Sequence, residues 1–303
     1  MLKKSKNMSH HEKIKNIKNK NGFIAALDQS GGSTPKALLQ YGVDKSFYKN
    51  DTEMYNQIHS MRSRIISAPS FNSQNIIGAI LFEMTMNREI EGKATAQYLW
   101  ENLGIVPFLK IDSGLEPELD GVHLLKEIDK LAEKLEIAVS KGIFGTKMRS
   151  VINKASEKGI NDVVNQQFEI SQKIISYKLI PIIEPEITIS IPDKEKAEQI
   201  LMSAILENLN KLSDDTKVIL KLSLPEIPNF YSRLINHPNV LRVVALSGGY
   251  DQKSAIKKLK NNNGVIASFS RALTEGLNIN QNDDDFNHII KVSIDDIAMA
   301  SSN

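Results

Sequence analysis

From residue 22 onward, short apolar runs alternate with longer amphipathic stretches. The amphipathic stretches, for example 120–142 and 190–212, carry apolar residues at helical spacing. Parallel strands need such helical crossovers, and strands covered on both faces form nearly continuous apolar runs. The pattern predicts eight strands, over residues 22–29, 75–86, 106–112, 143–150, 179–187, 217–225, 240–249 and 264–273.

Eight strand-and-helix units in about 250 residues predict a (β/α)8 TIM barrel, an α/β fold. An open doubly wound sheet is the competing fold, but no glycine-rich dinucleotide fingerprint follows the first run. No linker-like stretch divides the chain, so we expect one catalytic domain over residues 22–303. Residues 1–21 form a lysine-rich extension, which we expect to be a solvated helix outside the domain rather than an anchor to an anionic surface.

Composition and charge narrow the classes of function. With 38 basic and 36 acidic residues the net charge is +2, which argues against a nucleic-acid binder. No apolar run reaches the length of a membrane span, and the first twenty residues lack the apolar core of a signal peptide, so we expect a cytoplasmic protein. The absence of cysteine excludes a disulfide framework, thiolate metal ligands and a cysteine nucleophile.

Charged residues lie inside the predicted strands. Asp28, Lys110, Lys147, Glu184 and Lys221 each occupy the latter part of an apolar run, and the last four are spaced 37 residues apart. A barrel strand delivers such side chains to the C-terminal mouth of the barrel. A single one would be explained by a buried ion pair, but five at one rim predict a functional site.

Lys221, in the middle of its run, has the position of a nucleophile. A lysine attacks a carbonyl only as the free amine, which requires a pKa below the usual value of about 10.4. Burial and a second ammonium both favour the free amine, and we expect Lys147, and less directly Lys110, to supply the like charge.

Carboxylates complete the expected chemistry. Glu184 is placed to move protons while a carbinolamine forms and loses water. Asp28 would stay ionised beside a lysine and act on a substrate hydroxyl. Glu186 shares a strand face with Glu184 and would orient its neighbours. Together these residues predict a Schiff-base enzyme.

Two segments have the composition of anion sites. Gly248 and Gly249 end the seventh run and would let backbone N–H groups approach a phosphate, while Arg271 lies near the end of the eighth run as a two-pronged donor. Ser33 and Lys36 follow the first run and would meet a second phosphate. Two anion sites beside an amine predict a bisphosphate substrate.

The chain also resembles class I fructose-1,6-bisphosphate aldolases. The segments that carry the resemblance are AALDQSGGS, FLKID, TKMRS, PIIEPEI, VILKLSLP, ALSGG and SFSRAL, in the order of that family. The resemblance implies that Lys221 is the Schiff-base lysine and Glu184 the general acid and base, with Asp28, Lys147 and Glu186 as active-site partners. The residues expected to contact the substrate or its phosphates are Ser33, Lys36, Lys110, Arg149, Ser247, Gly248, Gly249, Ser268 and Arg271.

The resemblance implies reversible cleavage of fructose 1,6-bisphosphate to dihydroxyacetone phosphate and glyceraldehyde 3-phosphate, in glycolysis and gluconeogenesis. It implies a small-molecule substrate and neither metal nor cofactor, and it leaves a homo-oligomer open. Gln29 and Ala37 depart from the glutamate and arginine of the animal enzymes, and the terminal tyrosine of those enzymes is missing. These departures indicate a shorter, microbial-type branch.

Three alternatives stay open. A metal-dependent aldolase would need clustered histidines, whereas His59, His123, His237 and His288 are far apart in the sequence. A Schiff-base aldolase for another ketose phosphate, such as tagatose 1,6-bisphosphate, would use the same residues. A catalytically silent sugar-phosphate-binding protein would have no need of Lys221, Glu184, Asp28 and Lys147 together.

Overall fold

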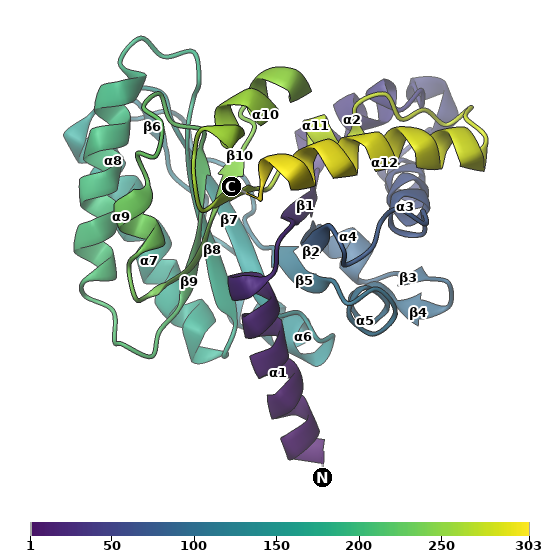
Figure 1. Cartoon of the computed structure of the whole chain (residues 1–303), viewed down its shortest axis with the longest axis horizontal. Coiled ribbons are helices and arrows are strands. Elements are labelled where there is room, and N and C mark those ends of the chain that lie inside the picture. The colour runs from purple at the N-terminus through teal and green to yellow at the C-terminus, as the bar shows by residue number, and fades with distance from the viewer. Residues whose placement is uncertain (1, 303) are drawn as a thin grey trace.

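The computed structural model describes residues 2–302 and shows a barrel of eight parallel strands (Figure 1). Each strand lies in one of the eight predicted apolar runs, although the fourth strand ends two residues past its run, and the predicted TIM barrel is confirmed. Neighbours in the barrel follow chain order, as expected when each strand is followed by a crossover. The strands are β1 (Phe23–Leu27), β2 (Ile76–Leu81), β5 (Val106–Lys110), β7 (Gly145–Ile152), β8 (Ile180–Ile187), β9 (Val218–Ser223), β10 (Val240–Leu246) and β11 (Val265–Ala267).

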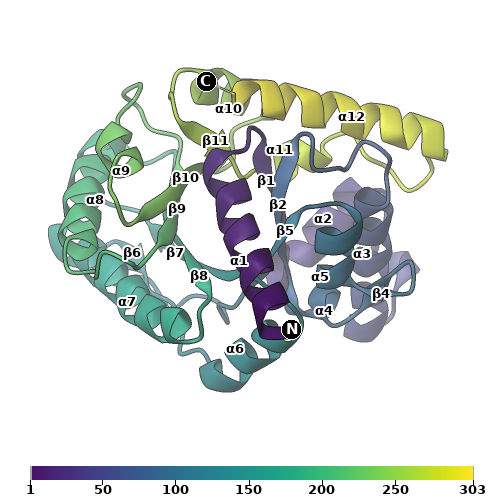
Figure 2. The same cartoon turned by 60° about the horizontal axis from the view of Figure 1, so that its bottom comes forward.

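Helices surround the barrel (Figure 2). The longer ones are α1 (Leu2–Asn19), α2 (Thr34–Gln40), α3 (Asp51–Ile66), α6 (Leu131–Ser140), α7 (Glu157–Ser176), α8 (Lys194–Leu209), α10 (Gln252–Lys260) and α12 (Asp283–Ala300). Shorter elements are η1 (Gly31–Ser33), η2 (Lys45–Phe47), α4 (Glu83–Met86), β3 (Glu89–Ile90), β4 (Lys93–Ala94), α5 (Thr95–Gln97), η3 (Tyr98–Asn102), β6 (Val122–His123), α9 (Ser232–Ile235) and α11 (Arg271–Thr274). None of the helices in residues 2–302 is long and apolar enough to span a membrane.

The interior of the barrel is apolar over its lower part. Inward-facing side chains, among them Ile24, Phe108 and Ile182, form one buried cluster inside the ring of strands. Gly145 makes room for this packing, because a Cβ there would lie 2.1 Å from the carbonyl oxygen of Ile180 and 2.9 Å from the Phe108 ring. Strand alternation then carries polar side chains toward the C-terminal mouth, two residues further along each strand.

The helix predicted over 120–142 begins later, at Leu131. The chain enters this segment through left-handed backbone at Asp120 and Gly121, and Val122 pairs with Ile152 at the end of β7. The side chain of Gln166 on α7 exchanges two hydrogen bonds with the backbone of residue 125. Tertiary contacts therefore satisfy the backbone groups that a helix would otherwise pair.

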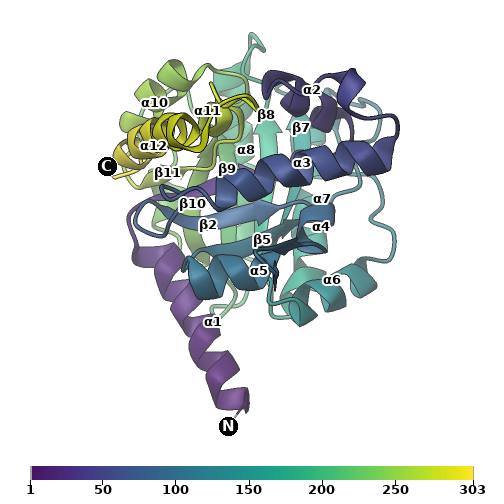
Figure 3. The same cartoon turned by 90° about the vertical axis from the view of Figure 1, so that its right-hand side faces the viewer.

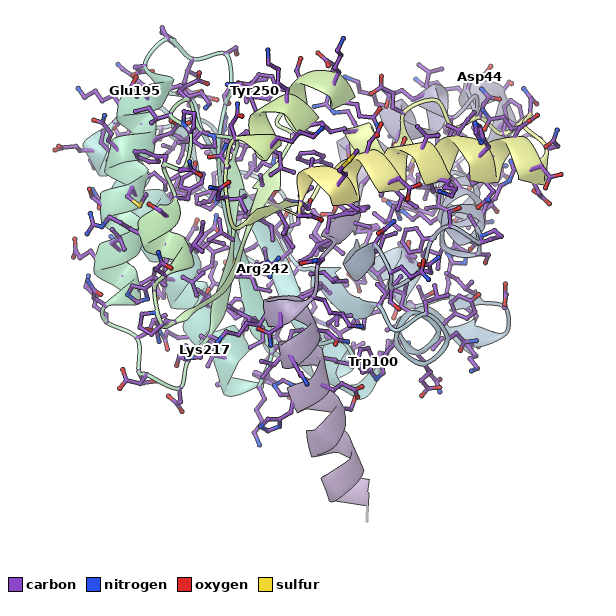
Figure 4. The ribbon with its side chains drawn as sticks, viewed as in Figure 1. Asp44, Trp100, Glu195, Lys217, Arg242 and Tyr250 are labelled. Atoms are coloured by element: carbon purple, nitrogen blue, oxygen red, sulfur yellow. The ribbon has the colours of Figure 1, made fainter. Side chains whose placement is uncertain are left out.

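Helix α1 closes the N-terminal end of the barrel (Figures 1 and 2). Ile17 is fully buried in the interior cluster, and the Arg242 guanidinium donates to the carbonyl of Lys18 at 2.7 Å. The Lys13 ammonium lies 5.1 Å from the centre of the Trp100 ring and donates to the carbonyl of residue 142; Figure 4 labels Trp100 and Arg242 beside the helix. The prediction of a solvated helix outside the domain is therefore wrong for the C-terminal half of α1, because buried side chains there pack against the open end of the barrel. The domain boundary at residue 21 stays a prediction.

Replacing Ile17 tests whether α1 is part of the folding unit. Ile17→Ala should lower the free energy of unfolding by about 2 to 5 kcal/mol, the usual range for a buried isoleucine. Lys15→Ala, at an exposed position of the same helix, should change it by less than about 0.5 kcal/mol. Urea titrations of the two variants make the comparison, and equal small effects would show that the helix does not contribute to barrel stability.

Candidate active site

A cavity of about 660 Å³ opens at the C-terminal ends of the barrel strands. Thirteen of the fourteen predicted site residues line it, and the fourteenth, Gly249, lies next to it beside Arg271. The lining residues among those predicted are Asp28, Ser33, Lys36, Lys110, Lys147, Arg149, Glu184, Glu186, Lys221, Ser247, Gly248, Ser268 and Arg271.

The centre of the cavity is a chain of alternating charges. The Lys221 ammonium lies 3.2 Å from one carboxylate oxygen of Glu184, and the other oxygen of Glu184 lies 3.2 Å from the Lys147 ammonium. Lys147 continues the chain to Asp28 at 2.7 Å. All four side chains are at most 10% exposed, so water screens these contacts only weakly. Glu184 is thus placed to exchange a proton with either lysine.

Lys147 and Asp28 hold each other in their charged forms. Burial disfavours the ammonium of Lys147, but Asp28, Glu184 and Asp112 together outweigh burial and raise its pKa above the ordinary value. Burial likewise opposes the charge of Asp28, whereas Lys147 and Lys221 lower the pKa of that carboxyl well below its usual range. Lys147 therefore stays a positive charge in the cavity, and Asp28 stays an ionised acceptor.

Asp112 is a site residue that the sequence interpretation missed. Its carboxylate lies 2.6 Å from the Lys110 ammonium and 3.9 Å from Lys147, and its side chain is only 5% exposed. The available signal was strand alternation, because Asp112 follows Lys110 by two residues and so shares its face. With Asp112 included, four carboxylates balance four cations at the centre: Asp28, Asp112, Glu184 and Glu186 against Lys110, Lys147, Arg149 and Lys221.

The spacing of 37 residues between successive charged strand residues, from Lys110 to Lys221, corresponds in part to the register of neighbouring strands. Lys110 pairs directly with Lys147, and Ile183 pairs with Leu220, so Glu184 and Lys221 follow at one level. Between β7 and β8 the register places Lys147 opposite Ile182 and Arg149 opposite Glu184. Such steps accompany the tilt of barrel strands, and here they set Lys147 one inward-facing position below Glu184.

Two segments at the rim, called the rim loops below, follow β1 and β11 and lead into helices α2 and α11, whose first turns carry the cations Lys36 and Arg271 without counter-charges. Neither Lys36 nor Arg271 contacts a carboxylate within 4.0 Å among the described side chains. Gly248 and Gly249 adopt φ of 60° and 114°, which glycine tolerates and which lets the backbone turn toward the cavity. The buried hydroxyl of Ser268, also at the cavity, has no hydrogen-bond partner among the described residues. Unpaired donors at two places in one cavity are suited to two anions.

Comparisons with known proteins agree with this geometry. The family model described as glycolytic fructose-bisphosphate aldolase class-I matches residues 11–229, more than half of the chain. The chain belongs to the class I fructose-bisphosphate aldolase family. The resemblance seen in the sequence motifs is thereby confirmed.

Bacterial relatives in this family extend over almost the whole chain. Fructose-bisphosphate aldolase class 1 of Clostridium acetobutylicum is 57% identical over 280 residues, 92% of this chain and 95% of the relative. The proteins of the same description from Synechocystis sp. and Porphyromonas gingivalis are 53% and 50% identical and cover 96% of this chain. The relatives support the expected microbial-type branch.

The barrel also matches a solved aldolase structure. A fructose-bisphosphate aldolase from Plasmodium falciparum, crystallised with TRAP and a small-molecule inhibitor, superposes with a TM-score of 0.75 over 98% of this chain and 95% of the other. At 20% sequence identity this match concerns the fold alone.

Departures from the animal aldolases lie within the cavity. Gln29 and Ala37 both line it, so the expected differences in phosphate contacts fall at the site itself. No tyrosine lines the cavity among residues 2–302.

The charged pair of Asp28 and Lys147 gives a pH-dependent prediction. Asp28→Asn should lower the free energy of unfolding at pH 7 by about 1.5 to 3 kcal/mol, the usual range for a hydrogen bond to a charged group. Since the pKa of Asp28 is depressed in the folded protein, this contribution is present above the unfolded value of about 3.9 and is lost as pH falls toward the folded value.

Urea titrations from pH 3 to pH 8 measure the difference between the wild-type protein and Asp28→Asn. The difference should be constant above about pH 5 and shrink below about pH 4. Asp214→Asn, in an exposed loop, provides the control and should have little effect throughout. A difference for Asp28→Asn that does not change with pH would refute the assigned charge state.

Proposed function

We propose that this aldolase-family chain cleaves fructose 1,6-bisphosphate reversibly to dihydroxyacetone phosphate and glyceraldehyde 3-phosphate through a Schiff base on Lys221, without a metal. The observation that carries the proposal is a buried lysine in contact with Glu184, in a cavity whose two unpaired cations, Lys36 and Arg271, lie in the first turns of two separate helices, α2 and α11. An amine between two anion sites fits a ketose with a phosphate at each end.

Schiff-base formation uses Lys221 and Glu184. The free amine of Lys221 attacks the keto carbon, and the resulting carbinolamine must lose its hydroxyl as water. Glu184, 3.2 Å from the Lys221 nitrogen, can pass the proton that the nitrogen loses to the carbinolamine oxygen and then give the resulting hydroxyl a second proton, so that water leaves and a protonated iminium remains. Lys147, 3.2 Å from the other oxygen of Glu184, remains a positive charge within the same chain of contacts.

The iminium then makes carbon–carbon cleavage feasible. A carboxylate removes the proton of the hydroxyl on the carbon two positions from the iminium carbon, and that carbon becomes the aldehyde product. The electrons of the broken carbon–carbon bond pass to the iminium nitrogen and leave an enamine on Lys221. Asp28, held ionised beside Lys147, is the candidate acceptor of the hydroxyl proton. Protonation of the enamine carbon and hydrolysis release the second product and regenerate the amine.

The rim loops supply substrate selection. Arg271 and the turn at residues 247–249 would hold the phosphate next to the keto carbon, and Lys36 with Ser33 would hold the distal phosphate. Because the eight central charges balance one another, the net positive charge available for the substrate comes from Lys36 and Arg271. A cytoplasmic location and self-association stay predictions.

Cleavage assays on wild-type protein and Lys221→Arg test the proposal. The wild-type protein should cleave fructose 1,6-bisphosphate faster than fructose 1-phosphate or tagatose 1,6-bisphosphate, and EDTA should leave the rate unchanged. Lys221→Arg keeps the charge but cannot form the imine, so its rate should fall by roughly 10³-fold or more. Lys217→Arg, on the surface just before β9 (Figure 4), is the matched control and should remain active.

The outcomes separate the alternatives. Faster cleavage of tagatose 1,6-bisphosphate would assign a different ketose phosphate, and binding of bisphosphate without turnover by the wild-type protein would indicate a silent binding protein. Loss of activity in EDTA that zinc restores would refute the metal-free mechanism.

A further inference from the structure

The two rim loops meet at the seam between the first and last barrel strands. Strand β1 is joined to the segment that follows β11 by one backbone hydrogen bond in the described chain, from the Ala26 N–H to the Phe269 carbonyl at 3.3 Å. The N–H of Ala267, at the end of β11, instead donates to the hydroxyl of Ser301 beyond helix α12. Backbone pairing therefore holds this seam only weakly, at the place where both anion loops leave the barrel.

A side-chain hydrogen bond spans the seam above the backbone contact. The Gln29 amide nitrogen donates to the Ser270 hydroxyl at 2.6 Å, and both residues line the cavity. Gln29 precedes the segment of η1 and α2 that carries Ser33 and Lys36, and Ser270 directly precedes Arg271. The contact thus joins the loop of the distal phosphate to the loop of the other phosphate.

Arg62 fixes the orientation of the Gln29 side chain from behind. Its guanidinium, on α3, donates to the backbone carbonyl and, at 3.3 Å, to the side-chain oxygen of Gln29, and it also donates to Thr85 at 2.8 Å. A guanidinium is a donor only, so it holds the amide oxygen toward itself and turns the amide nitrogen toward Ser270. Figure 3 shows α3 running along the outside of the barrel beside β2.

A contribution to stability does not explain the burial of Arg62. The residue is 1% exposed, forms no ion pair with a described carboxylate and has an unpartnered Nε, and burial lowers its pKa to about 10. An unpaired buried charge is costly, whereas a neutral side chain could fill the same space without that cost. The presence of a charged side chain at residue 62 is explained if its guanidinium is needed to orient Gln29.

We propose that Gln29 and Arg62 form a positioning pair that sets the distance between the two anion-binding loops and so favours a substrate with two phosphates. This inference rests on the proposed aldolase function. Arg62 does not line the cavity and acts through Gln29, whose amide transmits the constraint to Ser270. A substrate with one phosphate uses only one of the loops and does not depend on the distance between them.

The test compares kcat/KM for fructose 1,6-bisphosphate and fructose 1-phosphate in Gln29→Met and Arg62→Lys. Met has the shape of Gln without its hydrogen bonds, and Lys keeps the charge but cannot span the three acceptors. For both variants the ratio of the two kcat/KM values should fall about tenfold, the loss expected for one hydrogen bond to a charged group, with most of the change in KM for the bisphosphate.

Arg64→Lys is the matched control, because Arg64 lies on the same helix but contacts Tyr41, the carbonyls of Ile279 and Gln281, and Asp283. It should leave the ratio unchanged. If Gln29→Met and Arg62→Lys lower both kcat/KM values equally, or leave both unchanged, the positioning pair is refuted while the aldolase function stands. If Arg62→Lys does not fold, Gln29→Met alone decides by the same ratio. Failure of the wild-type protein to cleave the bisphosphate would instead overturn the proposed function and the inference with it.

Discussion

The ammonium of Lys147 lies between the carboxylates of Asp28 and Glu184, and the arrangement of the cavity depends on this contact. The two carboxylates come from the end of β1 and from β8, strands that are not neighbours in the barrel. One buried charge therefore ties separate sides of the mouth together. It also keeps Asp28 ionised and leaves the second oxygen of Glu184 for Lys221, so the positions of acid, base and nucleophile follow from a single charge.

The barrel lowers the free-energy cost of burying these charges, because it separates an apolar layer from a polar layer. Ile24, Phe108 and Ile182 fill the lower interior, and Ile17 of α1 closes the end of it. The charged layer lies above, where Lys147, Arg149 and Lys221 have carboxylate partners from a neighbouring or facing strand and Lys110 pairs with Asp112 of its own segment. Because the central charges are balanced, the unbalanced cations are confined to the rim, where a doubly phosphorylated substrate would bind.

Much of the scaffold was predictable from the sequence, since each buried strand leaves a continuous apolar run and each inward-facing charge interrupts it. Lys110, Lys147, Glu184 and Lys221 could be found in this way without any knowledge of their partners. Arg62 could not, because it lies on a helix at a position that reads as an ordinary polar residue. The contact between Gln29 and Ser270 joins residues 241 positions apart, and no local pattern records it.

The errors have a common physical origin in tertiary contacts. The segment before Leu131 has helical spacing but pairs with β7 and with Gln166 instead, and the lysine-rich helix α1 hides an apolar face that only the open barrel end makes useful. Asp112 was within reach of strand alternation, but a carboxylate at the last position of a run resembles the start of an ordinary loop. Local patterns therefore located the strands and most of the site, whereas the parts that depend on closure of the barrel required the structure.

The central claim, that Lys221 rather than Lys147 is the nucleophile, is tested most directly by trapping the iminium. Borohydride added with dihydroxyacetone phosphate should reduce the imine, inactivate the protein irreversibly and leave one triose phosphate adduct, and peptide mass spectrometry should locate it at Lys221. The charge chain predicts this selectivity, because Lys147 is held as an ammonium by Asp28 and Glu184 and cannot attack a carbonyl. An adduct on Lys147 or Lys110, or no adduct under conditions of active turnover, would contradict the account.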